Sequence, residues 1–379
     1  MHLDTKKSKK EALQRSQRKH RSLNLPVFFP DATYAAIHGV PFDYVKEKLS
    51  GLVVTTLHMH LLGLEKEFSH FGGYKKFAGL PEDCIILSDS GGFQVLSLIN
   101  RHGLGQITPD GAKFKNPEDG NSVMLTPELS QNIQHSINSD IRVTLDVPLM
   151  GPESEKEITE ALEITTKWAV RSKNQFLKNL DLTEAEFEQT KAQRTGKELH
   201  FSRPLLNAVV QGGNSVELRK RSGKELSRIG FDLYGFGGWP VDQNGKLMTK
   251  VIEAFVESLP SDSLTYGMGI GTPDDIATCH KIGIEIFDCV IPTRNGRHGT
   301  LYVTKGTGEK TGETFDVLHI KSAKYQFEDK PIDPECDCPV CKNYSRSYLR
   351  FLMKKKNPVG FTLASVHNIW WYLNFMRSL

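Results

Sequence analysis

The feature that most constrains the fold is a series of eight short, β-rich apolar runs separated by longer polar stretches. The runs cover residues 27–29, 52–56, 84–89, 141–146, 206–211, 231–236, 264–269 and 285–290. Most of them are continuously apolar rather than alternating, as strands of a parallel sheet are when both faces are covered. Eight such strands that alternate with helical stretches predict an α/β fold, a (β/α)8 TIM barrel.

The stretches between these runs carry signals for helix starts. Pro127 and Pro273 each follow a threonine, which places a capping hydroxyl before a proline in the first helical turn. We therefore expect helices over residues 127–138, 153–178 and 273–282. The stretches 99–125 and 179–205 are too long and too polar for bare crossovers, so we interpret both as insertions.

Three of the six cysteines lie close together near the C-terminus. Cys336, Cys338 and Cys341 form a C-x-C-x-x-C pattern, and His367 follows the last of them after 25 intervening residues. Three thiolates and one imidazole complete a tetrahedral shell with no open position, which is typical of structural zinc. The sequence therefore predicts one structural Zn2+ per chain, although three unligated thiols beside an unrelated histidine remain the alternative at this stage.

Basic residues are concentrated at the N-terminus, and this uneven charge helps to divide the chain into domains. Residues 1–25 carry eight basic and two acidic side chains, so residues 26–379 sum to −3 against a total of +3. A basic arm attracts phosphate without reading sequence, although a solvated terminus has the same composition. We predict a basic N-terminal tail (1–25), a catalytic barrel (26–300) and a zinc-binding subdomain with a terminal helix (301–379). In that last part we expect helices near 343–355 and 361–376, with a Pro-Gly break at 358–360.

The location of the protein can also be predicted. No apolar run reaches the roughly 18 residues that a membrane-spanning helix needs. The N-terminus lacks the apolar core of a secretory signal, and clustered cysteines beside scattered thiols favour a reducing compartment over a disulfide framework. We therefore expect a cytoplasmic protein with no membrane partner.

Polar side chains recur where the predicted strands end. Asp89, Asp146 and Gln211 end the third, fourth and fifth strands, and Asp288 lies in the eighth. The carboxyl ends of barrel strands meet at one mouth, where active sites form. Each residue alone is weak evidence for an active site, because an aspartate after a strand is often only a helix cap. Together with nearby glycines they suit a flat, hydrogen-bonding heterocycle on which Phe93 can stack.

These residues lie in segments that resemble the tRNA-guanine transglycosylases, the queuine tRNA-ribosyltransferase family. The matching segments are LSDSGGFQV (87–95), LTPE (125–128), VQGG (210–213), YGMGIGTPDD (266–275), FDCVIPTRNGRHG (287–299), and the cysteine cluster with VHN (366–368). They occur in the family's order and span about residues 26–376. The resemblance implies a barrel enzyme, a pentosyltransferase that exchanges a guanine in tRNA for a 7-deazaguanine.

The resemblance also implies roles for individual residues. Asp288 matches the family's nucleophile, which forms a covalent ribosyl-enzyme and makes the exchange a double displacement. Asp89 matches the acid/base residue. The positions that match the base-binding residues are Ser90, Phe93, Asp146, Gln211, Gly237, Gly238 and Met268. Arg294 and Arg297 match a segment that contacts tRNA.

Departures from the family pattern leave the incoming base open. Residues 239–243 read WPVDQ where bacterial members usually read LAVGE, so Gln243 replaces a glutamate that accommodates a 7-aminomethyl group. We expect a divergent bacterial-type member that acts on the wobble guanine of GUN-anticodon tRNAs. PreQ1 is the first choice of incoming base, with queuine and preQ0 as alternatives. We also expect that the hairpin usual before the first strand is missing.

Two other functions stay open at this stage. The same exchange on DNA would keep the chemistry and change the polymer. A non-catalytic RNA-binding subunit would keep the fold, but such family members lose the nucleophile, whereas Asp288 and Asp89 are present here. The partners that the resemblance implies are tRNA, guanine, a 7-deazaguanine base and a second copy of the chain in a homodimer, with the zinc-bearing end as the natural contact.

Overall fold

The computed structural model describes residues 20–102, 105–117, 119–149, 151, 153–310 and 312–379. Its largest sheet has eight strands in the order β2-β14-β13-β12-β11-β8-β4-β3. They are β2 (Val27–Phe29), β3 (Gly51–Thr55), β4 (Ile85–Asp89), β8 (Ile141–Val143), β11 (Leu205–Val210), β12 (Leu233–Phe236), β13 (Leu264–Gly267) and β14 (Ile286–Asp288). A parallel bridge between Asp31, which follows β2, and Val53 of β3 nearly closes the sheet. The predicted α/β barrel is confirmed.

All eight predicted strands exist, but β8 is shorter than expected. The apolar run extends to residue 146, whereas the strand ends at Val143. Beyond it, the N–H groups of Leu145 and Val147 donate to the hydroxyls of Ser172 and Thr165, at 3.4 and 3.0 Å, rather than to a neighbouring strand. Because both hydroxyls belong to a helix, this segment leaves the strand ladder while remaining buried.

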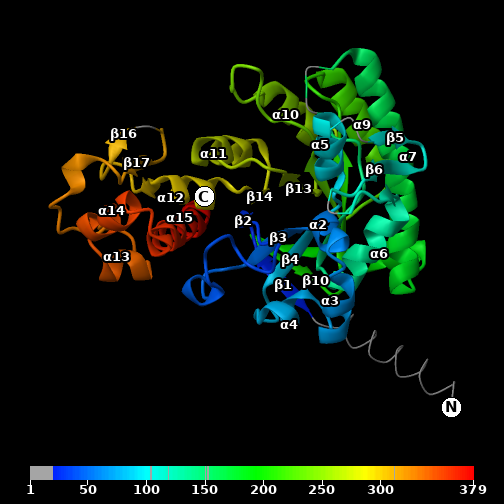
Figure 1. Ribbon diagram of the computed structural model, residues 1–379. Helices are drawn as coiled ribbons and strands as arrows, with labels where there is room; N and C mark the ends of the chain where they lie inside the picture. Colours follow the sequence, from blue (N-terminus) through cyan, green and yellow to red (C-terminus); the bar gives the residue numbers. More distant parts are fainter. Residues whose placement is uncertain (1–19, 103–104, 118, 150, 152, 311) are drawn as a thin grey trace. The chain divides into compact units, whose positions relative to one another are not determined.

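The chain divides into two compact units, and the first comprises residues 1–25 and 54–266. Its helices are α2 (Thr56–Leu61), α3 (Glu65–Phe71), α4 (Tyr74–Ala78), α5 (Gly92–His102), α6 (Pro127–Ile137), α7 (Glu155–Leu180), α8 (Glu184–Gln189), α9 (Val216–Ile229) and α10 (Thr249–Glu257). Strands β4, β8, β11 and β12 pair in parallel in this unit. Helices α7 and α9 pack against β11, and α6 packs against α7 (Figure 1).

Local signals account for the helix starts in this unit. The side chain of Thr126 accepts a hydrogen bond from the N–H of Leu129, with Pro127 in the first turn, as predicted. Helix α7 begins with a capping box in which Ser154 and Glu157 bond each other's backbone. Such pairs satisfy N–H groups that the first helical turn leaves without partners.

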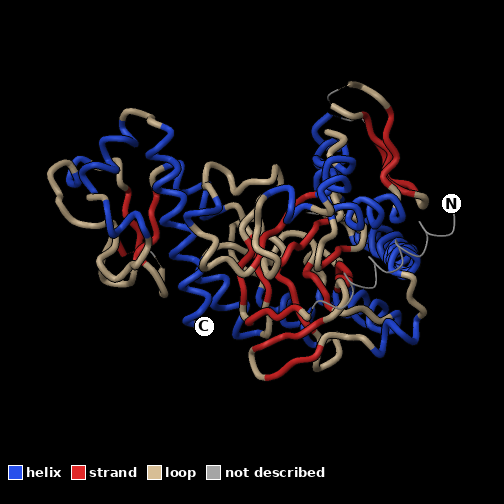
Figure 2. The backbone as a smooth tube through the Cα atoms, turned by 90° about the horizontal axis from the view of Figure 1, so that it is seen from below, coloured by secondary structure: helices blue, strands red, loops and turns tan. Residues whose placement is uncertain are grey.

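The two predicted insertions form antiparallel sheets, drawn red like the other strands in Figure 2. In the first, β5 (Gly105–Thr108), β6 (Gly111–Lys115) and β7 (Ser122–Leu125) pair in sequence order. In the second, β9 (Gln193–Thr195) pairs with β10 (Glu198–Phe201), and β10 pairs with β1 (Arg21–Asn24). The end of the predicted basic tail is therefore a strand, while residues 1–19 lie outside the described part. The domain boundaries after residues 25 and 300 remain predictions.

The second unit comprises residues 26–53 and 267–379. Strands β2 and β14 pair in parallel in it, and β15 (Thr300–Val303), β17 (Asp316–His319) and β16 (Glu309–Lys310) form an antiparallel sheet. The helices are α11 (Pro273–Ile282), α12 (Ile291–His298), α13 (Pro339–Asn343), α14 (Arg346–Lys354) and α15 (Pro358–Ser378), with short 3-10 turns at Phe42–Tyr44 and Ala323–Tyr325. Helices α12 and α15 pack extensively against each other in this unit.

The predicted break at 358–360 is wrong. Pro358 and Gly360 lie in the first turn of α15, where Pro358 needs no N–H partner and the side chain of Asn357 accepts from the N–H of Val359 at 2.9 Å. The chain turns two residues before Pro358, at Lys356, whose φ is 54°. Gly360 is required for another reason, because a Cβ atom there would lie 2.8 Å from Cβ of Leu352 in α14.

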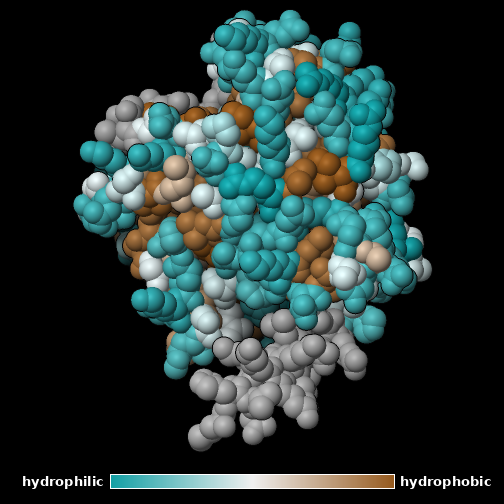
Figure 3. Space-filling model, turned by 90° about the vertical axis from the view of Figure 1, so that its right-hand side faces the viewer, coloured by the Kyte–Doolittle hydropathy of each residue, from teal (hydrophilic) through white to brown (hydrophobic). Residues whose placement is uncertain are grey.

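Hydrophilic side chains predominate on the face shown in Figure 3, and hydrophobic ones are exposed there in small separate patches. Among the described residues, no helix is both long enough and apolar enough to cross a membrane.

Candidate active site and metal centre

A buried polar cluster follows three strands of the first unit. Oδ2 of Asp146 accepts a hydrogen bond from Nε2 of Gln211 at 2.7 Å, and its Oδ1 accepts a longer one from Oγ of Ser90 at 3.5 Å. Ser90 and Gln211 are fully buried, and Asp146 is 6% exposed. The amide oxygen of Gln211 is buried and has no hydrogen-bond partner among the described residues. The cluster therefore offers an acceptor to an incoming donor.

The carboxyl group of Asp146 titrates near neutral pH. Burial raises its pKa to about 7, and the negative charge of Asp89 adds to this shift. The hydrogen bonds from Gln211 and Ser90 act in the opposite direction, because they stabilise the charged form. Both protonation states are thus accessible, and the carboxylate can accept hydrogen bonds from N–H groups of a ligand.

Asp89 is the last residue of β4 and is half-buried. Its Oδ1 accepts the N–H of Ser90 at 2.8 Å, and its backbone oxygen accepts the hydroxyl of Thr56 at 2.7 Å. Helix α5 then begins at Gly92, where a Cβ atom would lie 2.9 Å from the carbonyl oxygen of Asp146. A glycine at this position lets the start of α5 approach the polar cluster.

Two glycines and two aromatic side chains of the first unit belong to the predicted site or lie next to it in sequence. A Cβ atom on Gly237 would lie 2.4 Å from Nε2 of Gln211, and Gly238 has a φ of 88°. Phe93 is 44% exposed, and Trp239 is 49% exposed. Their rings meet edge to face, with centroids 6.3 Å apart. Sequence reasoning noted Trp239 only as a departure from the family, because its contact with Phe93 depends on tertiary structure.

The remaining predicted site residues belong to the second unit. Asp288 ends β14, and its Oδ1 accepts the N–H of Gly269 at 2.8 Å. Gly269 has a φ of 72°, which glycine adopts without strain, and it follows the half-buried Met268.

Helix α12 begins three residues after Asp288 and carries two arginines. Arg294 is exposed, and Arg297 is half-buried. Burial and the positive charge of Arg294 lower the pKa of Arg297. Its Nη1 is buried and lacks a hydrogen-bond partner among the described residues. Two guanidinium groups with an unsatisfied donor suit an anion such as phosphate.

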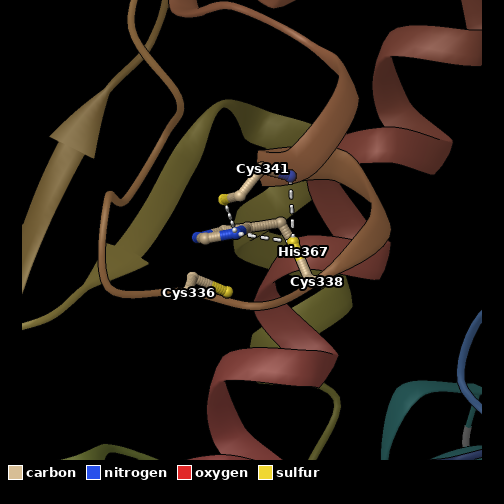
Figure 4. Close-up of side chains that lie close together, drawn as sticks. All are labelled: Cys336, Cys338, Cys341 and His367. Atoms are coloured by element: carbon tan, nitrogen blue, oxygen red, sulfur yellow. Dashed lines mark hydrogen bonds between the residues drawn. The ribbon is translucent and has the colours of Figure 1, made fainter.

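The cysteine cluster is brought together as the sequence predicted. Figure 4 shows Cys336, Cys338, Cys341 and His367 pointing toward one another, with the histidine on α15. Their candidate ligand atoms all lie within 4.8 Å of one another. These four side chains could hold a metal ion, and three thiolates with one imidazole fit a closed four-coordinate shell.

The surroundings of the cluster favour metal binding. Nε2 of His367 lies 2.7 Å from the carbonyl oxygen of Tyr302, so it donates there and leaves Nδ1 facing the sulfurs of Cys341 and Cys338, at 3.3 and 3.5 Å. The neighbouring thiols of Cys336 and Cys341 lower the pKa of Cys338 to about 4, because they stabilise its thiolate, and the pKa of Cys341 is raised correspondingly. The thiolate is the form that binds metals.

Comparison with known proteins agrees with this geometry. A model of the queuine tRNA-ribosyltransferase family matches residues 9–379. The chain belongs to this family. A queuine tRNA-ribosyltransferase of Psychrobacter cryohalolentis is 36% identical over 361 residues, which cover 95% of this chain and 86% of the relative. One of Pseudoalteromonas translucida is 34% identical over 94% of this chain and 85% of the relative, and one of Thiobacillus denitrificans is 34% identical over 95% and 88%.

Family membership confirms two predictions made from the sequence. The resemblance to the queuine tRNA-ribosyltransferases is confirmed, and the chain is an enzyme of this pentosyltransferase family. The roles assigned to single residues remain predictions. Ser90, Asp146, Gln211 and Gly237 form one cluster in the first unit, whereas Asp288 and the two arginines of α12 belong to the second.

Proposed function

We propose that this queuine tRNA-ribosyltransferase family member exchanges guanine at the wobble position of GUN-anticodon tRNAs for a 7-deazaguanine. The observation that carries this proposal is the buried Asp146–Gln211 pair with its unpartnered amide oxygen. Guanine has adjacent N–H donors on its pyrimidine ring, and two neighbouring buried acceptors suit that edge. Family membership over residues 9–379 supplies the polymer and the reaction class.

The proposed reaction has two displacement steps. A carboxylate oxygen of Asp288 forms a bond to C1′ of the nucleotide as the C1′–N9 bond breaks, and Asp89 donates a proton to the departing guanine. N9 of the incoming base then attacks C1′, its proton passes to Asp89, and the Asp288 carboxylate leaves. Two inversions retain the configuration at C1′, as in retaining glycosidases.

The other assigned residues bind the base or the tRNA backbone. Ser90, Asp146 and Gln211 bind the base edge, while the backbone at Gly237 and Gly238 lets the base approach closely. Phe93 and Met268 stack on the ring, and Arg294 and Arg297 bind phosphates beside the exchanged nucleotide. The half-exposed ring of Phe93 and the unsatisfied Nη1 of Arg297 support these assignments.

The incoming base is preQ1 in this proposal, with queuine and preQ0 as the alternatives that the experiment must separate. Gln243 is exposed, and its neutral amide removes the carboxylate that would pair with a charged aminomethyl group. A preference for preQ0, whose 7-substituent is uncharged, over preQ1 would therefore be consistent with the same enzyme class.

We also propose that the four-ligand cluster holds one structural zinc and that the enzyme is a cytoplasmic homodimer. The proposed contact is the zinc-bearing end. Tyr344 and Tyr348 stack there with centroids 5.4 Å apart and are 38% and 43% exposed, and Phe351 on α14 is 55% exposed. Aromatic residues are enriched at protein interfaces, which supports this choice.

The first experiment is incorporation of radiolabelled guanine into unmodified GUN-anticodon tRNA, with DNA as a parallel substrate, followed by a chase with preQ1, preQ0 and queuine. We expect label in tRNA, released by one of the three bases. Label in DNA alone would replace tRNA by DNA as the substrate. Label in neither polymer, with a folded protein that contains metal, would contradict the proposed exchange by this chain alone.

A further inference from the structure

Arg219, in the first turns of α9, is a buried cation to which the proposed reaction gives no role. It is fully buried, and Nη1 donates to the carbonyl oxygens of Val210 and Gly237, the latter at 2.9 Å. Nη2 donates to the carbonyl oxygen of Gly213 at 2.8 Å. The guanidinium also lies over the ring of Phe236, with Cζ 4.1 Å from the centroid. One side chain thus connects the carboxyl ends of β11 and β12.

The burial of this guanidinium is energetically unfavourable, which a purely structural role does not explain. The acceptors of its hydrogen bonds are the neutral carbonyl oxygens of Val210, Gly237 and Gly213, and its Nε is buried without a partner among the described residues. Burial lowers the pKa of Arg219 to about 9, so the group is still charged at neutral pH. Burying a charge without an opposite charge is unfavourable. A function that requires these strand ends to be fixed would explain why the charge is there.

The carbonyl groups that Arg219 binds lie beside Gln211, which the proposed function assigns to binding of the base. Val210 directly precedes Gln211, and its carbonyl oxygen also accepts the N–H of Gly237 at 3.0 Å. The Cα of Gly237 approaches Gln211 so closely that a Cβ atom would lie 2.4 Å from Nε2 of the glutamine. At Gly212 a Cβ atom would lie 2.7 Å from Cα of Arg219. The position of Gln211 is therefore determined from both sides by elements that Arg219 holds.

We infer that Arg219 is a positioning residue of the guanine site: it fixes the ends of β11 and β12 and thereby places the amide of Gln211 and the backbone at Gly237–Gly238. This inference rests on the proposed function. Arg219 contacts neither the base nor the ribose in this scheme. Its effect passes through Gln211, whose Nε2 must stay 2.7 Å from Oδ2 of Asp146 while its oxygen faces the ligand.

The chain provides a matched control at the opposite end of the same strand. Arg203 lies before β11 and is also buried, with Cζ 4.1 Å from the centroid of Phe187. It donates two hydrogen bonds of 2.8 Å to Asp232. Both arginines are buried, lie over a phenylalanine ring and are near an end of β11, but only Arg219 lies at the end that carries Gln211.

The test compares Arg219→Lys and Arg219→Gln with Arg203→Lys. Guanine affinity is measured by calorimetry on the full-length chain, alongside the KM and kcat of guanine exchange into tRNA. We expect both Arg219 variants to weaken guanine binding and raise its KM by about tenfold, the equivalent of one or two misplaced hydrogen bonds, with kcat changed less than KM. Lysine, which can still reach one carbonyl group, should retain more affinity than glutamine. Arg203→Lys should lower thermal stability and leave the KM for guanine within about twofold.

The pH dependence of guanine binding gives a second readout. The hydrogen bond from Gln211 favours the carboxylate of Asp146, while Asp89 is the charged neighbour that disfavours it. A displaced Gln211 should therefore move the midpoint of guanine binding to higher pH in the Arg219 variants and not in Arg203→Lys.

Wild-type affinity and midpoint in a folded Arg219 variant would overturn the inference, as would equal losses in Arg203→Lys. Failure of both Arg219 variants to fold while Arg203→Lys folds would also overturn it, because Arg219 would then be structural. Failure of the wild-type chain to bind or exchange guanine would instead contradict the proposed function.

Discussion

Gln211 donates a hydrogen bond to Asp146 over 2.7 Å, although the two residues are 65 positions apart, with helices α7 and α8 and strands β9, β10 and β11 between them. The bond leaves the glutamine oxygen as a buried acceptor and stabilises the charged form of a carboxyl group whose pKa burial has raised to about 7. The protein therefore maintains, near neutral pH, a group that can accept hydrogen bonds from a base or bind a proton.

The raised pKa of Asp146 predicts how stability changes with pH. The folded state binds this proton more tightly than the unfolded state, where the pKa is near its model-peptide value of about 3.9. The contribution to stability is therefore fully present below about pH 4 and is lost as pH rises through about 7. We expect the free energy of unfolding of the wild type to fall relative to Asp146→Asn over this interval, by at most about 1.4 kcal/mol per pH unit. Urea unfolding at several pH values measures this difference, and a constant or rising difference would contradict the assignment.

If Asp288 is the nucleophile, its substitution should abolish the covalent step while leaving tRNA binding nearly unchanged. Asp288→Asn replaces the carboxylate by a neutral amide of nearly the same shape, so it should abolish covalent trapping of tRNA and reduce exchange by about 10³-fold or more. tRNA affinity should stay within about threefold. Denaturing gels for the covalent complex and filter binding for affinity distinguish the two effects. Asp262→Asn, which removes an exposed carboxylate in the other unit, serves as the control for charge. A trapped complex in Asp288→Asn would show that another residue is the nucleophile.

The metal cluster predicts a stability effect. Cys338→Ser removes the thiol whose pKa falls to about 4, and a hydroxyl group is a poor zinc ligand. We expect zinc content to fall from one per chain to near zero and the free energy of unfolding to decrease, because the binding free energy of a structural metal contributes to folding. Elemental analysis and chemical denaturation give both values. Cys279→Ser changes a buried cysteine outside the cluster and should leave the metal content at one. Full zinc occupancy in Cys338→Ser would refute the four-ligand assignment.

Arg297 on α12, whose Nη1 has no hydrogen-bond partner among the described residues, predicts a salt-dependent contact with a tRNA phosphate. Arg297→Ala should weaken tRNA binding and lower the slope of log affinity against log salt by about one, the value of one phosphate contact. Arg228→Ala removes an exposed arginine from α9 and provides the control. Binding isotherms at four salt concentrations are sufficient. Equal slopes for Arg297→Ala and the wild type would remove Arg297 from the proposed tRNA surface.

Much of the fold was predictable because its signals are local. The eight apolar runs, the threonine–proline helix starts and the clustered cysteines each lie within a few residues of one another, and the structure contains each of them. The sequence was misread where two local signals conflicted. Pro358 and Gly360 indicate a break in most contexts, but here Asn357 caps a helix that starts at the proline.

The sequence by itself therefore determined the succession of strands and helices, the family and the four candidate metal ligands, since these depend on short-range pattern and residue type. Only the tertiary structure decided that β1 pairs with β10 across about 175 residues, that Trp239 meets Phe93, and that Arg219 holds the strand ends beside Gln211. It also decided the pKa of Asp146. The physical reason is the same in each case: strand register, burial and the field of neighbouring charges are properties of groups that approach one another only after the chain has folded.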